Sequence, residues 1–179
     1  MNWKIERSNV LQGIITFTPS IHYDIRGEIF STYNFEVFSP PICVARTGHM
    51  ETPFVEDKVS VSRKDVLRGL HGDYVTDKLV QCLHGELYLV VVDWREDSLT
   101  YKKWESYILN DRNRTEVFIP KGFLNGHLCL SDKCIFSYKQ TSYYSGAQDQ
   151  VSVAWNDPSL NIFWPIDNPI LSRRDSSEK

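Results

Sequence analysis

The stretch from Lys78 to Asp93 limits the fold of this chain more than any other part of the sequence. It consists of two apolar runs, Lys78–Leu83 and Glu86–Asp93, separated by a His-Gly pair. Two strand-like runs with a two-residue break between them are typical of a β-hairpin. We therefore predict a hairpin here, within a fold built mainly from strands.

The rest of the chain repeats this pattern of short strands with turn residues between them. Helical periodicity is poor, apart from short turns near residues 34–38 and 157–160. Eight or more short strands at this spacing favour a β-sandwich or barrel. A length of 179 residues suits a single domain over 1–179. The further predicted strands are Leu11–Thr18, Val59–Ser62, Asp65–Leu70, Trp104–Leu109, Glu116–Ile119, Leu128–Leu130 paired with Cys134–Lys139, and Val151–Trp155.

Composition excludes several classes of protein. Hydrophobic residues make up 41% of the chain and charged residues 24%, which indicates a globular rather than a disordered protein. A net charge of −3, with both signs mixed throughout, does not indicate a nucleic-acid partner. The N-terminus lacks the apolar stretch of a signal peptide, and no run approaches the roughly 20 apolar residues that cross a bilayer. We expect a cytoplasmic protein with no membrane partner.

The four cysteines give no CxxC pair and no zinc pattern. Cys82, Cys129 and Cys134 lie in strand-like apolar runs, whereas Cys43 does not. Buried free thiols are the expected state of the first three.

One short run combines residue types that can perform proton chemistry. Val66–Asp73 contains Arg68 and His71, and Lys78 follows shortly after. Histidine ionises near neutral pH and can accept a proton, and a lysine ammonium can stabilise the anion that results. This run is therefore a candidate site.

A second run indicates the type of β fold. Ile119–His127 has Pro-x-Gly at the start of a strand and a polar side chain, Asn125, three residues later. This arrangement resembles the second conserved motif of cupin jelly rolls, so we predict an all-β, cupin-type double-stranded β-helix. Metal-binding cupins usually present a histidine where this chain has Asn125, and a neutral amide is a poor ligand for a transition metal. We predict neither a metal nor a cofactor.

The chain resembles the dTDP-4-dehydrorhamnose 3,5-epimerase family and its relatives that act on nucleotide-linked 4-keto sugars. The resemblance extends from about Asp24 to Asp175 and rests on motifs that occur in the same order. These motifs are Asp24–Phe30, Leu67–His71, Lys78–Val80, Val92–Ser98, Ile119–Phe123, Tyr138–Lys139, Trp155–Pro158, Trp164–Pro165 and Leu171–Asp175.

The resemblance implies a role for four side chains. A hydrogen on a carbon next to a ketone is acidic because its conjugate base is an enolate. His71 would be the base that removes the protons at C5 and C3, and Asp175 would orient its imidazole. Lys78 would stabilise the C4 oxygen, and Tyr138 would return a proton from the opposite face.

The resemblance also implies substrate contacts and a homodimer. Arg26 and Arg68 would hold the diphosphate, because a guanidinium matches phosphate oxygens. Tyr143 would line the nucleotide–sugar site. Part of each site would come from the partner chain, and an N-terminal strand such as Leu11–Thr18 would add to the neighbouring sheet.

Two stretches of the chain differ from the rhamnose-pathway pattern. Gly72-Asp73 follows His71, Asn125 replaces a histidine, and His127 follows two residues later. These residues look more like a branch that modifies GDP-linked 4-keto-6-deoxy heptoses for bacterial capsule. We therefore expect a GDP-heptose substrate before a dTDP-linked hexose, with Asn125 and His127 as substrate contacts; His127 could equally fill space.

Two alternatives stay open. A nucleotide-sugar 3,4-ketoisomerase on the same fold usually shows a second histidine soon after the first, which Gly72-Asp73 does not supply. A non-catalytic nucleotide-sugar binding module would not need the base, the acid and the stabiliser. Charged residues elsewhere receive structural interpretations: Asp93–Asp97 as a solvated turn, and Arg173-Arg174 as residues that direct the tail.

Overall fold

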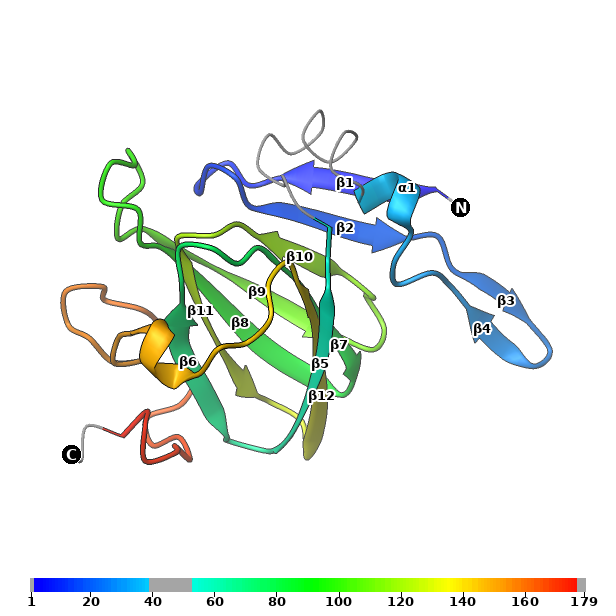
Figure 1. Cartoon of the computed structure of the whole chain (residues 1–179). Helices are drawn as coiled ribbons and strands as arrows, with labels where there is room; N and C mark the ends of the chain where they lie inside the picture. The colour runs from blue at the N-terminus through cyan, green and yellow to red at the C-terminus, as the bar shows by residue number, and fades with distance from the viewer. Residues whose placement is uncertain (1, 39–52, 177–179) are drawn as a thin grey trace.

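Strands make up nearly all of the regular structure in the computed structural model, which describes residues 2–38 and 53–176 (Figure 1). Within these residues, the helical elements are α1 (Phe35–Phe38) and a 3-10 turn at Ala147–Asp149. The strands are β1 (Trp3–Arg7), β2 (Ile15–Pro19), β3 (His22–Asp24), β4 (Gly27–Ile29), β5 (Glu56–Arg63), β6 (Leu67–Gly72), β7 (Lys78–His84), β8 (Glu86–Asp93), β9 (Trp104–Asn110), β10 (Glu116–Ile119), β11 (Phe123–Cys129), β12 (Lys133–Gln140) and β13 (Val151–Ser152).

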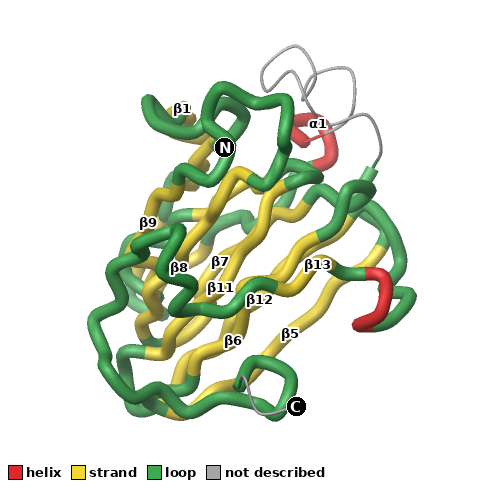
Figure 2. The backbone as a smooth tube through the Cα atoms, turned by 90° about the vertical axis from the view of Figure 1, so that its left-hand side faces the viewer, coloured by secondary structure: helices red, strands yellow, loops and turns green. Residues whose placement is uncertain are grey.

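Two antiparallel sheets face each other and enclose the core (Figure 2). The larger sheet has the order β1-β2-β10-β7-β12-β5, and the smaller has the order β13-β6-β11-β8-β9. This all-β arrangement is the cupin jelly roll that the sequence predicts. β3 and β4 form a separate hairpin that projects from the body of the molecule (Figure 1).

The predicted hairpin over Lys78–Asp93 is wrong. β7 pairs with β10 and β12, whereas β8 pairs with β9 and β11, so the two strands belong to opposite sheets. Gly85 turns the chain from one sheet to the other with φ of 76°, a value that glycine adopts without steric cost. The second predicted pair fails in the same way, because β11 and β12 also lie in different sheets.

Burial on both faces explains why β8 reads as a continuous apolar run. Its Leu87, Leu89 and Val91 side chains pack between the two sheets. Its alternate residues point outward and are covered by the C-terminal segment, where Trp164 meets the ring of Tyr88 edge-on with centroids 5.8 Å apart. The C-terminal segment is thereby fixed against the smaller sheet.

The sequence places Asp93 in a solvated turn with its charged neighbours. That prediction is wrong for Asp93, which is fully buried. Its carboxylate accepts hydrogen bonds from Arg95 Nε at 2.9 Å, Ser98 Oγ at 2.6 Å and Thr100 Oγ1 at 2.6 Å. Burial alone would raise the pKa of Asp93, but these donors lower it to about 2. The carboxylate therefore organises the turn that follows β8.

The N-terminal strand completes its own sheet. β2 pairs with β1 on one side and with β10 on the other, all within the same chain. Both edges of β2 are therefore paired within this chain, and the expectation that Leu11–Thr18 adds to a neighbouring chain's sheet stays a prediction.

Cys82, Cys129 and Cys134 are buried free thiols, as predicted, and Cys43 lies outside the described residues. Within the described part of the chain, every helix is too short to span a membrane.

Candidate active site

A cavity of about 370 Å³ opens between the two sheets. Its walls come from β5, β7 and β12 of the larger sheet, from β6 and β11 of the smaller sheet, and from the C-terminal segment. That segment runs beside β6, where Ile170 bridges Val66 (Figure 2). The cavity therefore lies between the two sheets, and the C-terminal segment forms one of its walls.

Alternation along the strands supplies both the core and the cavity. On β7, Lys78 and Val80 line the cavity, and Cys82 on the same face continues into the core. On β12, Tyr138 lines the cavity and Cys134 lies in the core. Because side chains two residues apart share a face, polar residues at one end of an inward face form a pocket beside the apolar core.

His71 and Asp175 form a hydrogen-bonded pair in this cavity. His71 Nε2 lies 2.7 Å from Asp175 Oδ1, although the two residues are 104 positions apart in sequence. Ser172 Oγ donates to the second carboxylate oxygen at 3.0 Å. Burial alone would raise the pKa of Asp175, but the hydrogen bonds from His71, Ser172 and the Gly69 backbone hold it below its ordinary value. Asp175 is therefore a carboxylate that can fix the orientation and tautomer of His71.

Lys78 brings a buried ammonium to the same cavity. Its Nζ donates to Asn125 Oδ1 at 3.1 Å, and the residue is 9% exposed. Burial lowers the pKa of Lys78, and the nearby charges of Lys58 and Arg174 lower it further against the opposing effect of Asp73. Asn125 is the Cα partner of His71 in the β6–β11 ladder, and both side chains line the same cavity.

An aromatic group forms another part of the lining. Tyr138 packs beside Phe136, and Phe136 stacks on His127 with ring centroids 4.2 Å apart. Burial raises the pKa of Tyr138, and Glu56 and Tyr144 raise it further against Arg68. The phenol therefore keeps its proton at neutral pH and can donate it.

Positive charge dominates the cavity. Lys58, Arg68, Lys78 and Arg174 all line it, and Asp175 is the one carboxylate among the described lining residues. The sequence interpretation missed Arg174: its guanidinium is held by Ser152 Oγ at 2.7 Å and Gln150 Oε1 at 3.2 Å rather than directing the tail. An excess of cations around a pocket of this size suits a ligand that carries a diphosphate.

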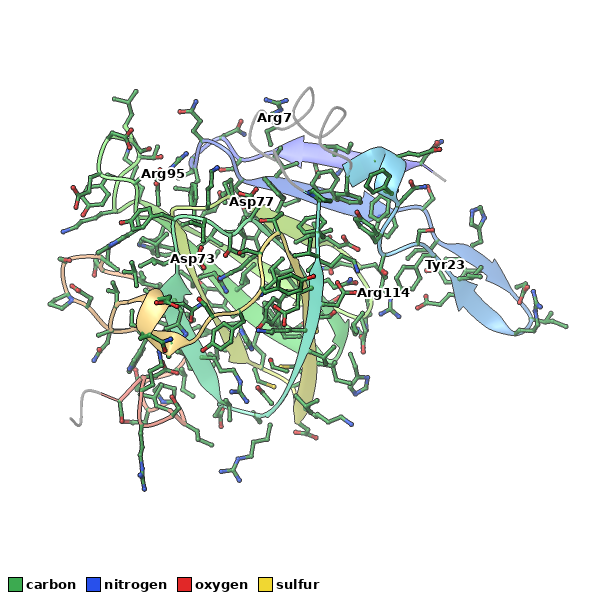
Figure 3. All side chains as sticks on the ribbon, viewed as in Figure 1. Arg7, Tyr23, Asp73, Asp77, Arg95 and Arg114 are labelled. Atoms are coloured by element: carbon green, nitrogen blue, oxygen red, sulfur yellow. The ribbon has the colours of Figure 1, made fainter. Side chains whose placement is uncertain are left out.

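Two predicted substrate contacts lie outside the cavity of their own chain. Arg26 is in the turn of the projecting β3–β4 hairpin, where it pairs with Asp24; Tyr23 of the same hairpin is labelled in Figure 3. Tyr143 is 74% exposed, and Tyr144 lines the cavity in its place, with its ring 3.9 Å from Lys58 Nζ. Neighbouring residues of an extended segment point in opposite directions, so Tyr144 faces the cavity while Tyr143 faces solvent.

The remaining predicted residues meet in the cavity. These are His71, Lys78, Tyr138, Asp175, Arg68, Asn125 and His127. Together they offer an oriented imidazole, a buried cation and a protonated phenol. Such a set can remove a proton from carbon, stabilise an oxyanion and return a proton.

The donor set does not form a metal centre. Among the residues that the structure describes, no three His, Cys, Asp or Glu side chains gather closely enough to hold a metal ion. At the position of the second cupin motif, Asn125 is engaged with Lys78.

Comparisons with known proteins find matches over nearly the whole chain. Residues 8–179 match the family model described as dTDP-4-dehydrorhamnose 3,5-epimerase. A protein of that name from Methanothermobacter thermautotrophicus is 39% identical over 174 residues, which cover 94% of this chain and 90% of the relative.

Solved structures agree with that match. The structure of an epimerase from Legionella pneumophila in complex with dTDP-4-keto-L-rhamnose superposes with a TM-score of 0.88 at 33% identity, covering 97% of this chain and 90% of that one. A dTDP-4-dehydrorhamnose 3,5-epimerase from Bacillus anthracis with TDP and pyrophosphate bound has a TM-score of 0.87 at 35% identity, covering 97% of each chain.

Proposed function

This chain belongs to the dTDP-4-dehydrorhamnose 3,5-epimerase family, and from that premise we propose that it inverts C3, C5 or both on a nucleotide-diphosphate 4-keto-6-deoxy sugar. The enzyme class itself, an isomerase acting on sugar nucleotides, follows from the family.

In the proposed mechanism, His71 removes a proton from the carbon next to the C4 ketone. Asp175 keeps the accepting nitrogen of His71 aimed at the substrate and stabilises the imidazolium that forms. Lys78 stabilises the enolate oxygen, and burial strengthens that interaction because little water competes. Tyr138 then delivers a proton to the opposite face of the same carbon, which inverts it.

The observation that carries this proposal is the His71–Asp175 pair in one cavity with Lys78 and Tyr138. A base, its orienting carboxylate, an electrostatic stabiliser and a neutral acid are the groups that epimerisation through an enolate requires. Arg68 and Arg174 provide the fork geometry that diphosphate oxygens favour.

For the substrate, we propose a GDP-linked heptose first. The support is the set of positions that depart from the rhamnose-pathway pattern, since Asn125 and His127 both line the cavity. A dTDP-linked hexose is the second candidate, favoured by the likeness to the Legionella structure that holds dTDP-4-keto-L-rhamnose. The product would enter the biosynthesis of a bacterial surface polysaccharide, such as capsule.

Residues 1–179 would form one domain, in line with the family match over 8–179. The enzyme would act in the cytoplasm as a homodimer without nucleic-acid or membrane partners. In the dimer, the projecting hairpin would carry Arg26 to the cavity of the partner; Ile25 and Tyr23 on this hairpin are large apolar side chains with 105% and 71% exposure.

The test is to incubate the protein in D₂O with GDP-linked 4-keto-6-deoxyheptose and, separately, with dTDP-linked 4-keto-6-deoxyglucose. Deuterium at C3, C5 or both, together with an inverted product, supports the epimerase. A carbonyl that moves to C3 supports the ketoisomerase. Binding without any exchange supports the binding module, and either of these last outcomes refutes the proposal. The faster of the two substrates identifies the nucleotide and the sugar.

A further inference from the structure

His127 is a buried polar residue with a ring nitrogen, Nε2, that no described group of the protein hydrogen-bonds. It lies on β11, two residues after Asn125, and its ring lines the cavity. The residue is 4% exposed, and its Nε2 has no hydrogen-bond partner among the described residues. Ser60 Oγ, opposite Phe136 on the neighbouring strand, is a second unpartnered polar atom of the same lining.

The ring of His127 is neutral at physiological pH. Burial lowers the pKa of His127 to about 3, and the charges of Arg68 and His71 contribute to this shift. His127 therefore serves neither as a second base nor as a cation for the diphosphate. A neutral imidazole offers one donor and one acceptor, a combination suited to a hydroxyl group.

The apolar contacts of His127 do not require a histidine. Its ring stacks on Phe136 with an interplanar angle of 24°, and a phenyl ring would pack there equally well. A buried nitrogen without a partner is costly, and such groups are uncommon in folded proteins.

We infer that His127 hydrogen-bonds a hydroxyl of the bound sugar ring and thereby determines which sugars the enzyme accepts. This inference rests on the proposed function, since it takes the cavity to be the sugar site. It assigns His127 to specificity and not to proton transfer.

The strand register indicates which part of the sugar ring His127 would face. Asn125 holds Lys78, the partner of the C4 oxygen, whereas His127 is paired across the ladder with Arg68, the proposed diphosphate contact. The diphosphate is attached at C1, so His127 lies between the C4 end and the C1 end of the ring. The hydroxyls at C2 and C3 occupy that interval.

The experiment measures binding with sugars that cannot react. Wild-type protein and His127→Phe are titrated calorimetrically with nucleotide-linked 6-deoxyglucose and with its 2-deoxy and 3-deoxy analogues. These sugars have an alcohol at C4, so no enolate forms. The nucleotide is dTDP or GDP, whichever binds wild-type protein more tightly. His84→Phe makes the same substitution at an exposed histidine outside the cavity and is the matched control.

We expect wild-type protein to bind one deoxy analogue about 10- to 100-fold more weakly than the parent sugar, because a buried partner is then left unpaired. His127→Phe should bind the parent sugar more weakly than wild type by a similar factor, and should bind that deoxy analogue as tightly as wild type does. His127→Gln, which keeps a donor and an acceptor, should retain the preference, and His84→Phe should behave like wild type.

Equal losses on all three sugars in His127→Phe would show that the ring only fills space and would refute the inference. Deuterium exchange by wild-type protein is scored separately. Exchange without this pattern of losses refutes the inference alone, whereas the absence of both exchange and binding refutes the proposed function as well.

Discussion

Lys78 shows how a single side chain depends on the charges around it. Its ammonium is buried, bonded to Asn125, and close to the positive charges of Lys58 and Arg174. Burial, the hydrogen bond to Asn125 and the nearby charges all matter for catalysis, because they act on the protonated amine, and only that form stabilises an enolate. Burial and the two like charges lower the pKa of Lys78 and bring its loss of charge closer to the working pH.

Removing the charge of Lys58 should therefore shift the pH profile of the reaction. Activity falls as pH rises through the pKa of Lys78, which lies below its ordinary 10.5. In Lys58→Met one like charge is absent, so that pKa rises and the alkaline fall of kcat/KM moves to higher pH. Deuterium exchange measured from neutral to alkaline pH tests this.

Lys139→Met makes the same change at a lysine that pairs with Asp57 and does not line the cavity. Its profile should match wild type. An alkaline limb that stays in place in Lys58→Met, or moves equally in both variants, would contradict this description of Lys78.

The sequence predicts the proposed catalytic residues of the site better than the other residues that line the cavity. His71, Lys78, Tyr138 and Asp175 were predicted and all line one cavity. Arg174 and Tyr144 were missed because their positions depend on how the segments after β12 and β13 lie against the sheets. No local pattern distinguishes Arg174 from Arg173, or Tyr144 from Tyr143.

At the scale of elements, the turn after β8 depends on an ion pair between a buried carboxylate and a partly exposed guanidinium. Asp93 is bonded to Arg95, and Arg95 also donates to the Gln12 carbonyl oxygen at 2.9 Å. The guanidinium of Arg95 lies 4.5 Å from the ring centroid of Phe123. One carboxylate therefore connects the end of β8, the start of β11 and the N-terminal loop.

Asp93→Asn should destabilise the protein by roughly 2–4 kcal/mol at pH 7, because it leaves a guanidinium without its buried partner. The pKa of Asp93 falls from 3.8 to about 2 on folding. Its contribution to stability is therefore complete above pH 3.8 and is lost as pH falls toward 2. Urea unfolding at pH 7 and at pH 3 should show a smaller difference between variant and wild type at the lower pH.

Asp97→Asn is the matched control, since Asp97 is exposed in the same turn. Its unfolding should lie within about 0.5 kcal/mol of wild type. Equal stability of Asp93→Asn and wild type at pH 7 would show that the buried pair does not organise this turn.

Strand positions were largely predictable, but strand partners were not. Glu116–Ile119 was predicted with its observed bounds, because extended segments carry local signals of residue type and alternation. The partners of β7 and β8 depend on which sheet each apolar face can cover. A two-residue break between strands permits a hairpin, and it equally permits the chain to pass from one sheet to the other. The chain passes to the other sheet here, where both faces of β8 are buried.

At the scale of the whole molecule, the projecting hairpin separates Arg26 from its own cavity (Figure 1). In the proposed homodimer, each complete site combines His71 of one chain with Arg26 of the other. Arg26→Ala and His71→Asn should then each have low activity when expressed alone.

Co-expression of these two variants should restore activity to about a quarter of wild type. Half of randomly formed dimers contain one chain of each kind, and one of their two sites has both residues intact. Deuterium exchange on the purified mixture measures this. Activity no higher than the sum of the two variants would place Arg26 outside the partner's site.

The central claim is that His71 removes a proton from the carbon next to the ketone. The most direct test is deuterium incorporation at C3 and C5 in D₂O by His71→Asn, with circular dichroism and ligand titration to verify its fold and binding. The predicted result is a protein that folds and binds its nucleotide sugar but exchanges roughly 100- to 10,000-fold more slowly than wild type. A folded His71→Asn variant that incorporates deuterium at the wild-type rate would contradict the claim.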